Sequence, residues 1–207
     1  MTILAIETSY KIATVTVKDN IKEITVTADT AKKHAETILP AVQEALAQSG
    51  HALSDLDYVA VDIGPGSFTG LRIGICAANA LGFALGIPVI PADSLSIVGE
   101  EALKEAEECF AMVDANNGNV YCARLERACP KPDVSVEPLS EFVSKIGPDA
   151  VAAGNADLEG TAFRMMRQVP NSLSLARFAF THPDLAVRTA EALYVQKSGA
   201  ERRRKTE

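Results

Sequence analysis

Apolar and polar positions alternate at the start of the chain, in the pattern expected of three short β-strands. Residues 3–6, 12–17 and 21–27 carry this pattern. A tight hairpin turn is expected at Asp19 and Asn20, between the second and third segments. Apolar residues then recur at helical spacing and predict a helix over 34–49, which Pro40 should kink or restart and Gly50 should end.

Residues 58–63 form a nearly continuous apolar run, which predicts a buried strand. The run leads into the string GPGSFTGLRIG at residues 64–74. Its glycines indicate a sharp turn, and the apolar pattern after them predicts a helix over 69–85. This strand–turn–helix unit is the most distinctive local feature of the chain.

Small residues recur at every fourth position of this predicted helix, and such positions share one face. The column consists of Gly70, Gly74, Ala78, Gly82 and Gly86. A helical Gly costs about 1 kcal/mol relative to Ala, so close approach of another backbone is expected. Tight packing against the chain's own sheet and contact with a helix of another subunit both fit, and Gly86 is also placed to end the helix. The apolar flanks would be Leu71, Ile75, Leu81 and Leu85.

The remaining pattern is weaker and alternates between strands and helices. A strand at 89–90, a helix at 94–107 and a hairpin of 110–114 with 120–126 come first. The later predictions are helices at 139–146, 158–168 and 183–193, and a strand at 150–153. The opening order matches the ribonuclease-H-like fold of actin and sugar kinases. We therefore expect an α/β fold of two lobes, actin-like, with mixed sheets flanked by helices: an N-terminal lobe at 1–105 and a smaller, degenerate lobe at 106–207.

Composition fits an ordinary globular protein, with 47% apolar and 23% charged residues among 207. No apolar run reaches the ~18–20 residues that span a bilayer, and the first residues lack the basic region of a secretion signal, so a cytoplasmic location is expected. The four cysteines form no CxxC pair, which favours buried thiols. A net charge of −7 lacks the basic footprint of nucleic-acid binding, and the charged tail at 201–207 is expected to be solvated.

The glycine-rich loop fits none of the common phosphate or nucleophile motifs. No Lys follows Gly70 as a P-loop requires, the third glycine is one residue late for GxGxxG, and Ser67 directly follows Gly66, which excludes GxSxG. An anion beside Arg72 remains open. The three histidines, His34, His51 and His182, form no i, i+4 pair for a metal.

Three acids follow predicted strands, where open α/β sheets place functional groups. They are Glu7, Asp62 and Asp114. Asp62 and Asp114 have no base or nucleophile beside them in sequence. Glu7 is followed by Thr8 and Ser9, in the place where an actin-like ATPase has an acid and small hydroxyls near phosphate, but the usual glycine is missing, and strand-end turn chemistry fits as well. The spacings support no Ser/His/Asp or Cys/His triad. We therefore assign no catalytic or metal-binding residue and no confident cofactor-binding residue.

Several strings together resemble the TsaB, or YeaZ, family. They are LAIETS at 4–9, HAE at 34–36 with Leu39-Pro40, and above all GPGSFTGLRIG at 64–74. Weaker landmarks follow at Asp114-Ala115, at 119–121, at Gly154-Asn155 and at 192–195. The resemblance covers nearly the whole chain.

The resemblance implies a non-catalytic dimerisation subunit of the machinery that places threonylcarbamoyl on the adenosine next to the anticodon of tRNA. The implied partners are a TsaD-type catalytic subunit and a TsaE-type ATPase, with tRNA contacted only through the complex and no membrane partner. A homodimer of the isolated chain stays open, as does a nucleotide at a subunit interface. No cofactor is expected on the chain alone.

The resemblance also shifts the interpretation of the glycine column, because the corresponding helix in the family packs against a partner's helix. The expected partner-interface residues are Gly70, Leu71, Gly74, Ile75, Ala78 and Gly82. The runner-up is an active ATP- or metal-dependent transferase or peptidase-like enzyme of the same fold. Against it, Ile38 stands where a TsaD-like HxxxH motif has its second histidine, after His34. Asn116 departs from the Arg that is frequent in the family after Asp-Ala.

Overall fold

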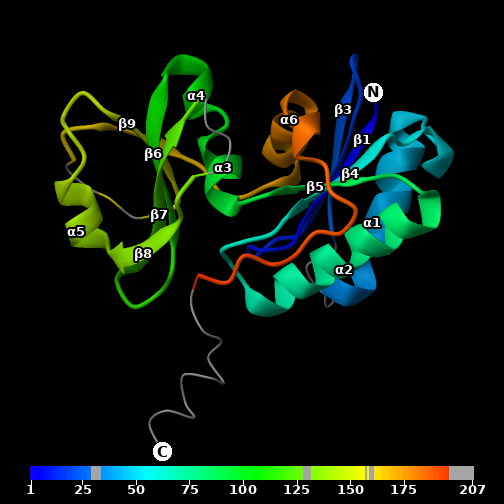
Figure 1. The fold of residues 1–207 in the computed structure, drawn as a ribbon, viewed down its shortest axis with the longest axis horizontal. Coiled ribbons are helices and arrows are strands. Elements are labelled where there is room, and N and C mark those ends of the chain that lie inside the picture. The colour runs from blue at the N-terminus through cyan, green and yellow to red at the C-terminus, as the bar shows by residue number, and fades with distance from the viewer. Residues whose placement is uncertain (29–33, 128–131, 157, 159–160, 196–207) are drawn as a thin grey trace, which may run out of the picture.

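The structure is a computed structural model that describes residues 1–28, 34–127, 132–156, 158 and 161–195. Two five-stranded mixed sheets lie side by side, each with its own helices (Figure 1). This arrangement confirms the predicted two-lobed α/β fold.

The first sheet contains the first five strands in the spatial order β3-β2-β1-β4-β5. Central β1 pairs antiparallel with β2 and parallel with β4, and β4 pairs parallel with β5. The alternating pattern predicted the three opening strands to within one or two residues. The strands are β1 (Ile3–Glu7), β2 (Thr14–Lys18), β3 (Glu23–Thr27), β4 (Tyr58–Asp62) and β5 (Val89–Ala92).

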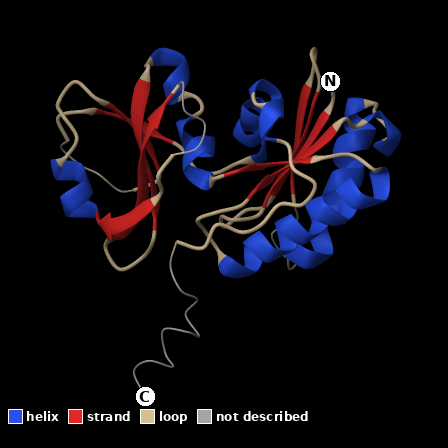
Figure 2. Cartoon of the chain, viewed as in Figure 1, coloured by secondary structure: helices blue, strands red, loops and turns tan. Residues whose placement is uncertain are grey.

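Helices cover both faces of this sheet (Figure 2). On one face α1 (His34–Ser49) and α2 (Phe68–Leu85) enclose a core with Leu4 and Ile6 of β1, and on the other α6 (Ser172–Thr181) packs on Ile3 and Ala5. A short 3₁₀ turn, η1 (Leu53–Asp55), joins α1 to β4. Successive β1 residues point to opposite faces, so this strand is fully buried.

The second sheet has the order β10-β9-β6-β7-β8. Its strands are β6 (Glu108–Asp114), β7 (Asn119–Glu126), β8 (Ser135–Pro138), β9 (Val151–Gly154) and β10 (Arg164–Arg167). Helix α5 (Leu139–Ser144) packs on one face through Phe142. Helices α3 (Ser94–Gly99) and α4 (Ala102–Glu105) lie on the other, with Leu95, Val98 and Ala102 in its core.

Three predicted helices are corrected. The helix expected at 94–107 is divided into α3 and α4. Helix α3 packs between the lobes, because Ile97 lies in a core of the first lobe and Leu95 lies in a core of the second lobe. The helix expected at 158–168 gives way to β10, which pairs parallel with β9. The helix expected at 183–193 is only the 3₁₀ turn η2 (Pro183–Leu185), followed by extended chain.

The expected lobe boundaries also need correction. The second lobe was expected to run from 106 to 207, but α6 packs on β1 and β2, and Val187 forms a bridge with Val89 of β5. The chain therefore enters the second lobe at about α3 and returns to the first by α6. The second lobe is an insertion within the first.

Helix α2 has the length and composition of a possible membrane span, which the search for long apolar runs did not anticipate. Its 18 residues pack on β4 and α1 in this structure. This is the placement of a helix on the flank of a folded lobe.

Candidate functional site

The glycine-rich string forms the connection from β4 to α2. After Asp62 the chain passes through a cis Gly64–Pro65 bond, and the Ser67 side chain caps the helix by accepting a hydrogen bond from the Gly70 N–H at 3.2 Å. At the far end Gly86 adopts φ +70°, the left-handed cap that the sequence predicts.

The glycine column of α2 faces the end of β1 within the same chain. A Cβ on Gly70 would lie 1.9 Å from the Thr8 carbonyl oxygen, and one on Gly74 would lie 2.3 Å from Thr8 Oγ1. The Thr8 hydroxyl donates to the Gly70 carbonyl at 2.7 Å. Close approach is therefore the reason for Gly70 and Gly74, and the neighbour that approaches them is Thr8. A Cβ on Gly82 would instead lie 2.9 Å from Val89 Cγ2 and 3.0 Å from the Ile87 carbonyl oxygen.

This geometry corrects the expectation that the column forms the partner interface. All six predicted residues are buried in the isolated chain and have almost no surface left to offer another subunit. Their exposed fractions show this directly: Leu71 is 1% exposed, Ala78 0% and Ile75 8%. The six are Gly70, Leu71, Gly74, Ile75, Ala78 and Gly82.

The opposite side of α2 is exposed and mainly apolar. It forms a shallow groove with α1, of about 770 Å³. The groove is lined by Ile38, Leu39, Phe68, Thr69, Arg72, Ile73, Cys76, Ala77, Ala80, Leu81 and Ala84. Since Arg72 is the one charged residue among them, this groove, here called the α2 face, presents an apolar surface with little charge.

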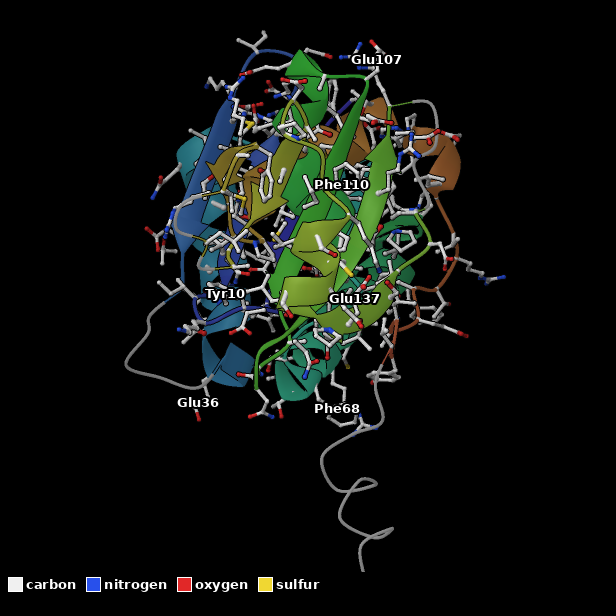
Figure 3. The ribbon with its side chains drawn as sticks, turned by 90° about the vertical axis from the view of Figure 1, so that its left-hand side faces the viewer. Tyr10, Glu36, Phe68, Glu107, Phe110 and Glu137 are labelled. Atoms are coloured by element: carbon white, nitrogen blue, oxygen red, sulfur yellow. The ribbon has the colours of Figure 1, made fainter. Side chains whose placement is uncertain are left out.

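Phe68 closes one end of the α2 face. Its ring lies 5.2 Å from that of Tyr194, and the Arg72 guanidinium lies over it at 4.6 Å. Figure 3 shows Phe68 at the lower edge of the molecule, at the start of α2. Tyr194 belongs to the extended segment after η2, so the returning chain borders the α2 face.

A cleft of about 510 Å³ separates the lobes on the side where β1 ends. The first lobe lines it with residues 9–11 and 65–67, and the second with Val113, Asp114, Asn116, Tyr121 and Asn155. Asp114 accepts a hydrogen bond from the Asn116 N–H and is itself exposed. Asn116 has φ +64°, a conformation that Asn tolerates.

A buried cluster of carboxyl and hydroxyl groups lies beneath this cleft. Glu7 and Asp62, at the ends of neighbouring strands, both contact Ser9, whose Oγ is 2.7 Å from Glu7 Oε1 and 2.7 Å from Asp62 Oδ2. Asp62 also accepts from Ser94 Oγ and from the Gly64 N–H. Glu7 Oε2 is buried without a hydrogen-bond partner.

Burial raises the pKa of both carboxyl groups. The pKa of Glu7 is raised mainly by desolvation and then by the charge of Asp62, against the hydrogen bonds from Ser9 and Tyr10. The pKa of Asp62 is raised by desolvation, opposed by its hydrogen bonds from Gly64, Ser9 and Ser94.

The structure brings together two of the three strand-end acids, Glu7 and Asp62, and places Asp114 at the cleft rim. Sequence reasoning missed Asp93, whose carboxylate caps α3 by accepting from the Leu95 and Ser96 N–H groups, and it missed the contact of Ser94 with Asp62. The Asp-Ser pair before an apolar run was the available signal.

The predicted lack of a metal site remains a prediction. Ile38 is 2% exposed in the first core, so its position offers no ligand to a metal. Within the described ranges no group of three or more His, Cys, Asp or Glu residues is arranged to hold a metal. The side chain of His34 and the whole of Cys129 lie outside the described residues. The free thiols of Cys109 and Cys122 are buried, as the sequence predicts, whereas Cys76 is exposed on the α2 face, which corrects the expectation for that residue.

Comparison with known proteins agrees with this architecture. The family model "TsaD: tRNA N6-adenosine threonylcarbamoyltransferase" matches residues 20–192. A Pseudomonas aeruginosa YeaZ structure has a TM-score of 0.73 and 28% identity, over 93% of this chain and 99% of that one. A second, described as an uncharacterized protein with similarity to peptidase YEAZ from the same organism, has a TM-score of 0.79 and 27% identity, over 94% and 99%.

Two curated relatives carry the name "tRNA threonylcarbamoyladenosine biosynthesis protein TsaB". The one from Haemophilus influenzae is 34% identical over 135 residues, 64% of this chain and 57% of the relative. The one from Escherichia coli is 39% identical over 98 residues, 46% and 42% respectively. The chain thus matches about half the length of these curated relatives.

A two-lobed α/β fold and a family match over most of the chain define the class of protein. The chain belongs to the family that the TsaD model describes and, within it, to the TsaB/YeaZ group.

Proposed function

We propose that the chain is a non-catalytic subunit needed for threonylcarbamoyl modification of tRNA, which acts by binding a TsaD-type catalytic subunit. The names of the curated relatives support the pathway. The match to the TsaD model supports kinship with the catalytic subunit.

The observation that carries the proposal is the α2 face. Small and apolar side chains such as Ala77, Ala80 and Ala84 line it, and only Arg72 brings a charge. Depletion of charge is typical of the core of a protein–protein interface. The small residues of α2, beside Ile38 and Leu39 of α1, would let helices of another subunit pack at the usual interaxial distance of about 8–10 Å.

A subunit of the same fold is the occupant that fits best. Because the family model is that of the catalytic subunit itself, a TsaD-type protein is expected to present an equivalent pair of helices. Like faces of like folds pair around an approximate twofold axis. The same argument allows a homodimer when the chain is alone.

The remaining partners follow from charge and from the family. With a net charge of −7, the chain is expected to meet tRNA only through the complex. A TsaE-type ATPase is proposed as the third component.

The test is a charge placed in the α2 face. Ala80 is exposed, so Ala80→Arg should leave the fold intact while burying an unpaired charge in the contact. We expect at least tenfold weaker association with a purified TsaD-type subunit, measured by light-scattering chromatography. Complex-dependent tRNA modification should fall in parallel, and the chain alone should show none.

Ala47→Arg is the matched control, since Ala47 is an exposed alanine of α1 among the polar Gln43, Glu44 and Gln48, away from the groove. It should associate like wild type. Unchanged association of folded Ala80→Arg would reject the α2 face, and modification by the chain alone would reject the non-catalytic role.

A further inference from the structure

Three consecutive residues at the end of β1 join two sites. Thr8 points into the glycine cradle of α2, whereas Glu7 and Ser9 point to the other face of the sheet, into the cluster beneath the cleft. The Ser9 carbonyl oxygen also accepts from the Ser67 N–H at 2.8 Å, at the N-terminus of α2. The cluster and the start of α2 are therefore held by the same short segment.

If both acids are ionised, the cluster has too few hydrogens for both contacts of Ser9 Oγ to be hydrogen bonds. Ser9 Oγ lies 2.7 Å from an oxygen of Glu7 and 2.7 Å from an oxygen of Asp62, but a hydroxyl has one hydrogen to donate. Both contacts are hydrogen bonds only if one carboxyl donates to Ser9. Two ionised carboxylates around one hydroxyl would leave an unshielded repulsion in a buried place.

The donors around each acid indicate which one holds the proton. Glu7 Oε1 already accepts from the Ser9 N–H at 2.6 Å and the Tyr10 N–H at 3.2 Å, as an anionic oxygen does. Asp62 Oδ2 receives no backbone N–H, whereas Oδ1 accepts from Gly64. Ser94 Oγ lies 2.8 and 2.9 Å from the two Asp62 oxygens and can donate to Oδ1.

We propose that Asp62 is a neutral acid at pH 7, that its Oδ2 hydrogen is donated to Ser9, and that Ser9 in turn donates to ionised Glu7. These two hydrogen bonds depend on pH, and they hold the buried cluster beneath the cleft together with the start of α2. It goes beyond the proposed function and does not depend on it.

The charged surroundings are few among the described residues. Asp93 adds a third carboxyl nearby, and its own donors, Leu95, Ser96 N–H and Ser96 Oγ, keep it hydrogen-bonded. The facing parts of β2 and α6 carry the uncharged Thr14, Thr16 and Ser172. Lys11 and Asp114 line the exposed cleft above.

The sign of the pH effect follows from burial. A carboxyl that is harder to ionise in the fold binds its proton more tightly there than in the unfolded chain, whose acids titrate near pH 4. Stability is therefore lost as the pH rises from about 4 past the raised pKa of the carboxyl that holds the shared proton. The lost proton leaves two adjacent anions and breaks one of the two bonds of Ser9.

The test compares wild type with Asp62→Asn, whose amide N–H can donate to Ser9 as the neutral acid does. Infrared difference spectra at pH 7 should show the C=O band of a buried neutral carboxyl in wild type and not in Asp62→Asn. From pH 5 to pH 8.5 the thermal midpoint of wild type should fall relative to that of Asp62→Asn. Hydrogen exchange at residues 64–70, corrected for intrinsic rates, should rise with pH only in wild type.

Asp149→Asn, at an exposed aspartate, is the matched control and should keep the band and the pH dependence of wild type. Persistence of the band in Asp62→Asn would place the proton elsewhere and overturn the proposal. Parallel pH profiles of wild type and Asp62→Asn would overturn it as well. So would a rise in the wild-type midpoint at pH 8 with Mg²⁺ or Mn²⁺ that Asp62→Asn lacks, because the pair would then be a cation site.

Discussion

Contacts of Thr8 determine how closely the start of α2 packs on the first sheet. Its carbonyl oxygen and its hydroxyl occupy the space that side chains at residues 70 and 74 would fill. The sequence predicted the close approach but not the neighbour, because a column of small residues looks the same whether a sheet of the same chain or another subunit lies against it. Only the placement of β1 beside α2 resolves that ambiguity.

Gly74→Ala tests this packing. Its Cβ would lie 2.3 Å from Thr8 Oγ1, so we expect overpacking to lower the free energy of unfolding by about 1–3 kcal/mol, measured by urea denaturation. Gly74→Leu, which places a larger side chain against the same oxygen, should fail to fold.

A double variant gives the control. Thr8→Ala removes the clashing oxygen, so Gly74→Ala should cost less in that background, with a coupling free energy of about 0.5 kcal/mol or more. Strict additivity of the two changes would contradict the contact.

At the scale of elements, sequence reasoning succeeded where one physical signal dominated. The strands of the first sheet alternate or are fully apolar, and α2 has a cap at each end. It failed at β10, where Arg164 and Met165 favour a helix but pairing with β9 makes a strand. Sequence reasoning also missed α6, because Ser172 and Ser174 interrupt the apolar pattern of a helix whose apolar stripe packs on the first sheet.

The same limit applies to the candidate site. Glu7 and Asp62 were each visible as acids at strand ends. Their meeting depends on β1 and β4 being neighbours in the sheet, which no local pattern states.

Asn79 of α2 forms two hydrogen bonds with the returning segment after η2. Asn79 donates to the Ala190 carbonyl at 3.0 Å and accepts from the Ala190 N–H at 2.9 Å. Asn79→Ala leaves both backbone groups without that partner, and we expect a loss of about 1–3 kcal/mol in unfolding free energy.

Limited trypsin digestion tests whether the hydrogen bonds of Asn79 hold the returning segment in place. Arg188 is exposed in the returning segment, and cleavage there should be faster in Asn79→Ala than in wild type. Asn79→Asp, which keeps the acceptor, should be intermediate. Equal cleavage rates in all three proteins would show that Asn79 does not hold the segment.

For the whole molecule, one arginine joins the parts that pack around α6. Arg177 donates to Glu23 of β3 at 2.8 Å and to Glu101, between α3 and α4, at 2.5 Å. Lys18 and Lys104 extend this into a network of five charges. Arg177, followed by Lys18, lowers the pKa of Glu23 to about 2 against partial burial.

Arg177→Met should therefore destabilise the protein in a pH-dependent way. Because the folded pKa of Glu23 is depressed, the network stabilises the fold above about pH 4.5 and loses that contribution as the pH falls toward 2. Denaturant midpoints of wild type and Arg177→Met should differ at pH 7 and converge as the pH approaches 2. A gap that stays constant across this range would assign the effect to packing alone.

The insertion of the second lobe has a consequence for synthesis on the ribosome. β1 is made before the second lobe, yet the helix that covers one of its faces, α6, begins only at Ser172, after the entire second sheet. The growing chain therefore carries Ile3, Ala5 and the other apolar groups of that face without this cover until α6 has been made. The second lobe has all its strands earlier, so the part encoded in the middle can close before the part encoded at the start.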